Sequence, residues 1–218
     1  VDKNITLTIE AGVAVKFDGY YYLMVEGILD VTGSPLAPVT FTSNASLPSP
    51  NDWKGIQSSG FNSVMTFNYT KIEYASTGIY NNNGNITIAN SEISFNNVGI
   101  YYFQHSHYNL TQGNIIDNVI RSNKIGVQID VYHGPVGNLR LENNAIMYND
   151  DGLTIELYNK SPFNVTITKN VISLNNLFGV TIEGGAPGKS LMKITRNYVT
   201  FNGDHGIYLN LWSKESVK

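Results

Sequence analysis

The chain has 218 residues, of which 42% are hydrophobic and 14% are charged, and its formal net charge is −3 at pH 7. This balance allows a sizeable core and excludes the basic surface that a nucleic-acid partner requires. Cysteine is absent, which excludes disulfides, thiolate zinc sites and cysteine nucleophiles, and no apolar run is long enough for membrane insertion.

Residues 1–60 predict short strands separated by turn-rich loops. Proline and serine mark the loops at 34–38 and 46–50. This region is less regular than 61–218, but no linker separates the two parts, so we expect a single domain over 1–218. Alternating apolar residues indicate five strands in it, at 7–9, 13–17, 23–25, 28–31 and 39–42.

From residue 55 onward, two anchor positions recur in phase. The first is a glycine followed by an apolar residue, and the second is a polar residue upstream of it, which is usually asparagine. Two anchors that drift together over many units favour a solenoid over a β-sandwich. The glycines are Gly55, Gly78, Gly99, Gly126, Gly152, Gly179 and Gly206, and the upstream anchors are Ser91, Asn118, Asn144, Asn170 and Asn197.

Each repeating unit contains three short alternating stretches. One unit reads Leu139-Arg-Leu141, then Asn144-Ala-Ile-Met-Tyr-Asn149, then Gly152-Leu-Thr-Ile155. A single unit cannot bury its apolar residues, so the units are expected to stack as parallel strands about 4.8 Å apart. We expect the asparagines to adopt left-handed turn geometry and to hydrogen-bond to the same amide one coil away, and the glycines to form tight corners.

The chain resembles pectin-lyase-like right-handed β-helices over nearly its whole length. Residues 7–18, 38–43 and 52–56 are similar to the start of β-helix segments in exported archaeal and bacterial surface proteins, and the later units resemble the generic parallel β-helix repeat. The resemblance implies an all-β fold, a right-handed single-stranded parallel β-helix of about eight coils of 21–28 residues with three short strands per coil. It also implies an extracellular or cell-surface location. It does not choose a function, because the group contains lyases, hydrolases, epimerases, adhesins and inert stalks.

Three carboxylates are predicted to stack on neighbouring coils. The fourth residue after each repeat glycine is expected to point outward, and in successive coils it is Phe103, Asp130, Glu156, Glu183 and Asn210. Like charges at strand spacing repel. Asp130, Glu156 and Glu183 therefore predict a bound Ca²⁺, a raised pKa with catalytic use, or simple solvation. We expect no cofactor unless Ca²⁺ binds at these three residues.

The loops that leave this edge are rich in tyrosine and histidine. Tyr108, Tyr132 and Tyr158 are candidates for stacking on sugar rings, although they could equally pack the loops against the helix. His105 and His107 flank a serine, with His133 one coil further on. A histidine pair needs further ligands to hold a metal, so we interpret these residues as ordinary loop histidines.

Two acidic elements resemble parts of polygalacturonase-type hydrolases. They are Asp150-Asp151 and Asp204-His205-Gly206, and both come just before a repeat glycine. The register places them two coils apart, or roughly 10 Å. We therefore do not expect them to act together.

Asparagine sequons indicate an exported glycoprotein. A further sequon at Asn159 is followed by Pro162, which weakens it as an acceptor. The predicted glycosylation sites are Asn4, Asn44, Asn68, Asn85, Asn109 and Asn164.

We favour a non-enzymatic role, as a structural or adhesive β-helix outside the cell. Its unpaired end strands are expected to pair with further copies of the chain, end to end, in a filament or layer. One alternative is a polysaccharide lyase or hydrolase that uses the acidic edge. Another is a glycan-binding module that uses the same edge and the tyrosine and histidine loops.

Overall fold

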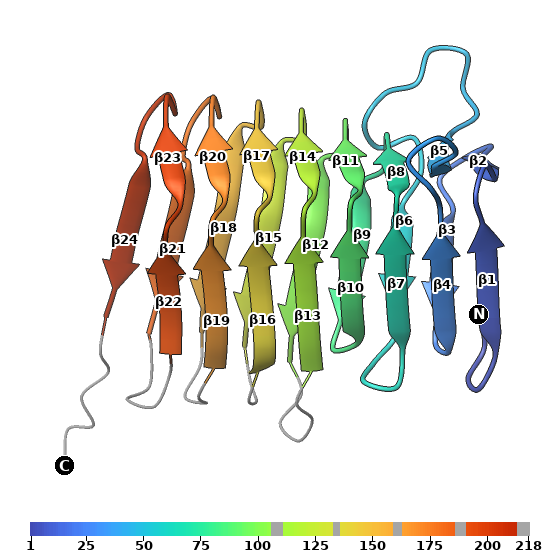
Figure 1. Cartoon of the computed structure of the whole chain (residues 1–218), viewed down its shortest axis with the longest axis horizontal. Coiled ribbons are helices and arrows are strands. Elements are labelled where there is room, and N and C mark those ends of the chain that lie inside the picture. Colours follow the sequence, from blue (N-terminus) through green and yellow to red (C-terminus); the bar gives the residue numbers. More distant parts are fainter. Residues whose placement is uncertain (106–110, 133–135, 159–162, 186–190, 213–218) are drawn as a thin grey trace.

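The computed structural model is a right-handed parallel β-helix, as predicted (Figure 1). It describes residues 1–105, 111–132, 136–158, 163–185 and 191–212, with no account of the side chains of Val136 and Phe163. Each coil adds one strand to each of three eight-stranded sheets, and all the pairings between these strands are parallel.

We name the sheets A, B and C. Sheet A contains β1 (Thr6–Glu10), β4 (Ile28–Thr32), β7 (Val64–Asn68), β10 (Asn85–Ala89), β13 (Thr111–Ile116), β16 (Val136–Glu142), β19 (Phe163–Thr168) and β22 (Leu191–Thr195). Sheet B contains β2 (Ala14–Phe17), β5 (Val39–Ser43), β8 (Thr70–Glu73), β11 (Glu92–Ser94), β14 (Val119–Arg121), β17 (Ala145–Met147), β20 (Val171–Ser173) and β23 (Tyr198–Thr200). Sheet C contains β3 (Tyr22–Val25), β6 (Gly55–Ser58), β9 (Thr77–Asn82), β12 (Val98–Gln104), β15 (Ile125–Val131), β18 (Asp151–Leu157), β21 (Val180–Gly184) and β24 (Ile207–Leu211).

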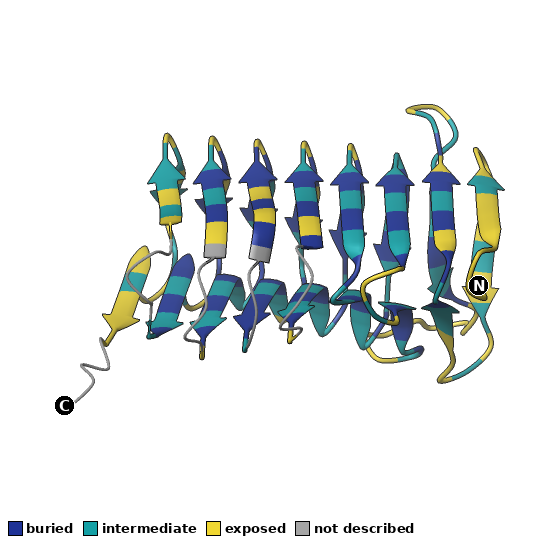
Figure 2. Cartoon of the chain, turned by 90° about the horizontal axis from the view of Figure 1, so that it is seen from below, coloured by how far each residue is buried: buried dark blue, intermediate teal, exposed yellow. Residues whose placement is uncertain are grey.

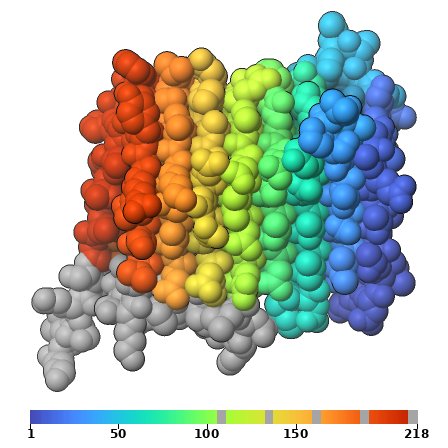
Figure 3. Space-filling model, in the orientation of Figure 1, coloured from blue at the N-terminus to red at the C-terminus, as the bar shows by residue number. Residues whose placement is uncertain are grey.

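The core is a set of apolar rows that run along the helix axis. Side chains alternate between the inside and the outside of each strand, so an in-register stack places like on like. In sheet B, for example, Ile72, Ile93, Ile120, Ile146 and Ile172 are paired in sequence and fully buried. The burial pattern is densest in the middle coils, whereas the strands at both ends are more exposed (Figure 2). Successive coils form bands along the molecular surface (Figure 3).

Two buried asparagine rows close the corners on either side of sheet B. In the first row, the amide nitrogen of Asn118 donates to the amide oxygen of Asn144 (3.0 Å), and Asn144 donates likewise to Asn170 (2.9 Å). In the second row, Asn123 donates to Asn149 (3.1 Å) and Asn149 to Asn175 (3.0 Å). The predicted bond from each amide to its neighbour one coil away is therefore confirmed.

The left-handed residue at these corners is not the asparagine, as we had predicted, but the residue before it. Asp117, Asn143 and Lys169 precede the first row and have φ of 59°, 55° and 57°. Ser122 and Tyr148 precede the second row and have φ of 57°. Each turn carries this strain in a residue whose side chain is free to vary, while the next residue supplies the buried amide. The amide hydrogen bonds outweigh the cost of left-handed backbone at non-glycine residues.

The prediction that the repeat glycines form tight corners is wrong for most of them. Of the seven, only Gly55 has a positive φ. Five of the others, Gly78, Gly99, Gly126, Gly152 and Gly179, are needed for close packing between coils: a Cβ on Gly126 would lie 2.6 Å from the carbonyl oxygen of Gly152 and 3.0 Å from the amide nitrogen of Asn149. Glycine is therefore required here because the neighbouring coil and the asparagine row leave no room for a methyl group.

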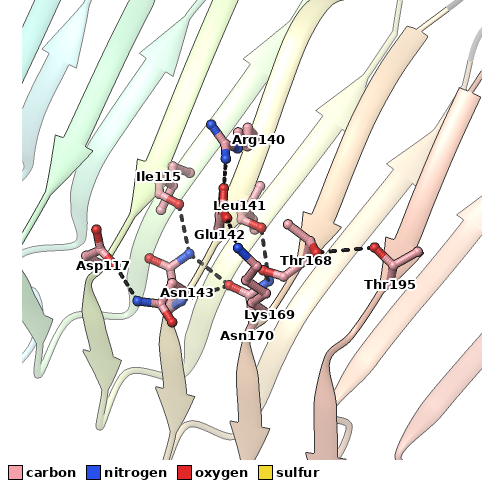
Figure 4. A network of polar contacts seen from close by, with 11 residues as sticks. Ile115, Asp117, Arg140, Leu141, Glu142, Asn143, Thr168, Lys169, Asn170 and Thr195 are labelled. Atoms are coloured by element: carbon pink, nitrogen blue, oxygen red, sulfur yellow. Dashed lines mark hydrogen bonds and ion pairs between the residues drawn. The ribbon is translucent and has the colours of Figure 1, made fainter.

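A charged network joins neighbouring coils at the edge of sheet A (Figure 4). Glu142, which is 8% exposed, receives the Lys169 ammonium at 2.9 Å and also pairs with the Arg140 guanidinium. Beside it, the Asn143 amide donates to the Asp117 carboxylate. The two cations compensate the cost of burying Glu142, and the Lys169 contact bridges two coils.

No helix in the part of the chain that the structure describes is long and apolar enough to cross a membrane.

The glycine packing leads to a matched test. Gly126→Ala should lower the free energy of unfolding by about 1–3 kcal/mol, because its methyl group overlaps the next coil. Gly206→Ala should change it by less than about 0.5 kcal/mol, because its methyl group meets nothing nearer than a Val199 methyl at 3.7 Å. Urea denaturation of both variants checks this, and equal destabilisation would contradict it.

Candidate ligand-binding face on sheet C

The outer face of sheet C carries the predicted row of carboxylates. Phe103 pairs with Asp130, Asp130 with Glu156, Glu156 with Glu183, and Glu183 with Asn210. The predicted register is therefore confirmed at all five positions. The three carboxylates lie on the adjacent strands β15, β18 and β21.

Asp130 differs from the other two because it is only 4% exposed. The Tyr101 hydroxyl donates to it at 2.6 Å, and the Gln128 amide nitrogen lies 3.2 and 3.3 Å from its two oxygens. Both partners point to the same face of the sheet as Asp130. Gln128 comes two residues before Asp130 in β15, and Tyr101 comes two residues before Phe103 in β12. Asp130 therefore serves the packing of this face and is covered by its neighbours.

The pKa values around Asp130 reflect this burial. Loss of solvent raises the pKa of Asp130, and the Glu156 charge adds to the rise, while the hydrogen bonds from Tyr101 and Gln128 oppose it. The pKa of Tyr101 is also raised, first by burial and then by its bond to Asp130. The Tyr101 hydroxyl thus remains a donor over the physiological range.

Aromatic rings surround this carboxylate and extend to the edge of the sheet. Tyr101 lies 5.0 Å from Tyr80 and 5.9 Å from Phe103, measured between ring centroids. Tyr132 lies 5.5 Å from Phe103 and stacks on Tyr158 at 4.3 Å and 18°. His105 stacks on Phe103 at 5.9 Å. We call these six residues, Tyr80, Tyr101, Phe103, His105, Tyr132 and Tyr158, the aromatic patch.

The exposed end of the patch combines a ring with a carboxylate. Tyr158 is 52% exposed, and its hydroxyl contacts the Glu156 carboxylate. That contact, with burial as a smaller contribution, raises the pKa of Tyr158. Two stacked tyrosine rings and a carboxylate thus meet at the surface, a combination suited to a ligand with apolar faces and hydroxyl edges.

Comparison with known proteins identifies the family to which this chain belongs. A family model described as "Periplasmic copper-binding protein (NosD)" matches residues 39–217. The chain belongs to the NosD family. Neither the curated proteins nor the solved structures contain a significant match to it. Membership of the NosD family, whose description is periplasmic, places the chain outside the cytoplasm and agrees with the predicted export.

No group of three or more histidine or acidic residues that could hold a metal was found within the described ranges. The Tyr101 hydroxyl and the Gln128 amide donate to Asp130, and the Tyr158 hydroxyl contacts Glu156. Calcium at Asp130, Glu156 and Glu183 stays an unconfirmed prediction. His107, Tyr108, Asn109 and His133 lie outside the described residues.

The predicted glycosylation sites all differ from the buried asparagine rows. Asn4, Asn44 and Asn164 are exposed, and Asn68 and Asn85 are half-buried. The amide oxygens of Asn68 and Asn85 accept hydrogen bonds from the Asn90 side chain and from the Gln112 backbone, respectively. Glycosylation at these positions stays a prediction.

The acidic turn elements lie two coils apart, as the register predicts. Backbone hydrogen bonds connect Asp150 to Leu177 and Leu177 to Asp204, which makes these residues equivalent corner positions in successive coils. His205 contacts Asp204 at 2.9 Å and stacks on Phe178 at 5.6 Å. The apolar coil of Leu177 and Phe178 thus separates the two elements.

Sequence reasoning missed Tyr80, Tyr101 and Gln128 as members of this face. The signal was present, because they are the second residues after Gly78, Gly99 and Gly126. In a strand, residues two apart share a face. We had assigned only the fourth position after each glycine, so the rings next to the carboxylates were overlooked.

The buried carboxylate predicts a pH-dependent stability. Asp130 has a raised pKa in the folded state, so the unfolded state loses its proton first as the pH increases. The contribution of Asp130 to stability should therefore decline from about pH 3.9, the ordinary aspartate value, up through the raised folded pKa. Asp130→Asn should remove this decline, which urea denaturation at a series of pH values will show. Identical profiles for the two proteins would contradict the assignment.

Proposed function

We propose that this chain is a non-catalytic β-helix of the cell envelope that binds a neutral glycan on the aromatic patch. The stacked pair of Tyr132 and Tyr158 beside Glu156 is the observation that carries the proposal. A sugar presents CH groups on its faces, and these pack on the electron-rich face of an aromatic ring. Its hydroxyls can donate to a carboxylate such as Glu156.

The charge of the face favours a neutral ligand. Among the described residues, the polar groups at the patch are carboxylates, tyrosine hydroxyls, the Gln128 amide and the His105 imidazole, and none of them is a lysine or arginine. A uronic acid would place its own carboxylate against Glu156 and Glu183, and like charges at this spacing repel. Hydroxyl-rich neutral sugars are therefore the ligand class that fits.

The geometry supports binding more than catalysis. A glycosidase needs two carboxylates that both reach the scissile bond, and Asp130 is covered by Tyr101 and Gln128. The other two carboxylates, Glu156 and Glu183, do not differ clearly in environment, so neither is distinguished as the acid of such a pair. We therefore place the polysaccharide lyase or hydrolase second to the binding module.

Copper, which the family description names, finds no suitable site in the described residues. Copper favours thiolate, thioether and imidazole ligands, and the chain has no cysteine. His105 lies at the end of β12 and His205 before β24, four coils apart, or roughly 19 Å at strand spacing. Of the four methionines, Met65 is fully buried in the core, and the half-buried Met24, Met147 and Met192 lie on three different sheets. We therefore derive no copper chemistry for this chain.

A rigid β-helix with a sugar-binding side also fits an adhesive role. Adhesion through that face, a cell-surface location and N-glycosylation are parts of the same proposal. End-to-end assembly is a separate prediction that the glycan proposal does not require.

The rings provide the test. Tyr132→Ala and Tyr158→Ala should each raise the Kd for a neutral oligosaccharide at least tenfold, because each removes one ring that stacks on the sugar. A tenfold change in Kd corresponds to about 1.4 kcal/mol of binding free energy. Isothermal titration with the best ligand from a panel of neutral and uronic oligosaccharides measures the loss.

Tyr148→Ala is the matched control. Tyr148 is 55% exposed but lies at the corner between sheets B and C, outside the patch. It should bind within twofold of the natural chain. Binding that survives both patch substitutions, or release of shortened sugars by the natural chain, would refute a binding module at this site.

A further inference from the structure

Charge is segregated by face in the last three coils. Among the described residues of 136–212, all the lysines and arginines lie on sheet A or at the corner that follows it, namely Arg140, Lys169, Lys193 and Arg196. Apart from Glu142, the acidic residues of the same range lie on sheet C or at the corner before it, namely Asp150, Asp151, Glu156, Glu183 and Asp204. The described part of these coils thus has a positive side and a negative side at the same level along the helix axis.

The basic side is exposed and only partly neutralised. Arg140 and Lys169 are half-exposed and share Glu142 (Figure 4). Lys193 and Arg196 are exposed, and neither forms an ion pair with any residue that the structure describes. We call these four residues the basic patch.

Among the described residues, the acidic side forms no ion pair with a lysine or arginine, and its neighbouring lysine is Lys124, one coil earlier, whose charge acts on Asp151. Asp150 accepts from the Asn176 amide, Asp151 from the Phe178 backbone, and Asp204 contacts His205. Within the described ranges, none of these three or Glu183 pairs with a lysine or arginine. We call Asp150, Asp151, Glu183 and Asp204 the acidic patch, and Glu156 is left to the aromatic patch.

Charged residues have the same spacing along the helix axis in the basic patch and in the acidic patch. Arg140 pairs in register with Thr166, and Thr166 with Lys193, so these two cations are two coils apart. Asp150 and Asp204 are also two coils apart, with Leu177 between them. When two solenoids lie side by side with parallel axes, cations and carboxylates that both repeat every roughly 10 Å can therefore meet at more than one coil.

We propose that this chain associates laterally with a second copy of itself, the basic patch of one copy against the acidic patch of the next. The contact is heterologous, because each copy uses a different face for each neighbour. It leaves one patch free at each end of a pair and therefore extends into rows. It uses the sides of the solenoid, in contrast to the end-to-end pairing of strands, and does not depend on the glycan proposal.

Salt distinguishes this contact from an apolar one. The Debye length is about 30 Å at 10 mM salt and about 3 Å at 1 M. Sedimentation velocity of the natural chain should therefore show a weight-average mass at least twice that of the monomer at low salt, and a monomer at high salt. A monomer at both salt concentrations, or association that persists at 1 M, overturns the proposal.

Charge reversal then identifies the faces. Lys193→Glu/Arg196→Glu leaves the basic patch, together with Glu142, with a net negative charge, so both sides become acidic. Asp150→Lys/Glu183→Lys/Asp204→Lys leaves Asp151 as the one carboxylate of the acidic patch against three lysines, so both sides become basic. Each variant alone should be monomeric at low salt, because its two patches repel. An equal mixture of the two variants should recover the doubled mass, because opposite charges again face each other.

The mixture also separates this result from misfolding, since an unfolded variant would not restore a specific complex, and circular dichroism checks each variant alone. Lys3→Glu/Lys16→Glu is the matched control, because it reverses two exposed lysines in the first coils and should associate as the natural chain does. Association by either patch variant alone, or no recovery in the mixture, contradicts the proposal.

Discussion

The buried asparagine hydrogen bond between coils is the interaction on which this structure depends. Each amide in the two rows bonds to the next amide and to a backbone carbonyl, as Asn144 does with Asn170 and Ile115. Its oxygen also accepts the backbone N–H of the previous asparagine. These bonds satisfy polar groups inside the corners, where water cannot reach. They also require neighbouring coils to stack in register, so one interaction sets both the corner and the stacking.

The glycines and the left-handed residues follow from the same constraint. The asparagine row at the corner between sheets B and C lies so close to the next strand that Gly99, Gly126 and Gly152 have no room for a side chain. The left-handed turn brings the asparagine inward and leaves the preceding residue outside. Corner residues as different as Asp117, Asn143 and Lys169 can therefore occupy equivalent places, and they supply the charges of the outer surface.

The sequence predicted the fold because its inward residues are repetitive. In-phase glycines and asparagines were enough to predict parallel stacking and the row from Phe103 to Asn210. The reasons assigned to them were less reliable: glycine was expected to bend the chain, but it makes room for the neighbouring coil. Spacing shows which positions are equivalent, whereas the backbone angle at a corner depends on contacts made one coil away.

The outer face was harder to predict because nothing requires it to repeat. The burial of Asp130 depends on Tyr101, a residue of the neighbouring coil whose position relative to it becomes clear only in three dimensions. The charge segregation of the last coils also appears only after each residue is assigned to a sheet. A repetitive interior thus supports a variable exterior, where the aromatic patch and the two charged patches occupy different surfaces.

Hydrogen exchange of the asparagine backbone amides tests the central role of the two rows most directly. The N–H groups of Asn118, Asn123 and Asn144 lie at corners, yet each donates to the side-chain oxygen of an asparagine one coil away. If these bonds hold the coils together, the three amides should exchange only through global unfolding, as slowly as the slowest amides of the central strands. Exchange through local opening, at rates typical of surface turns, would contradict this account.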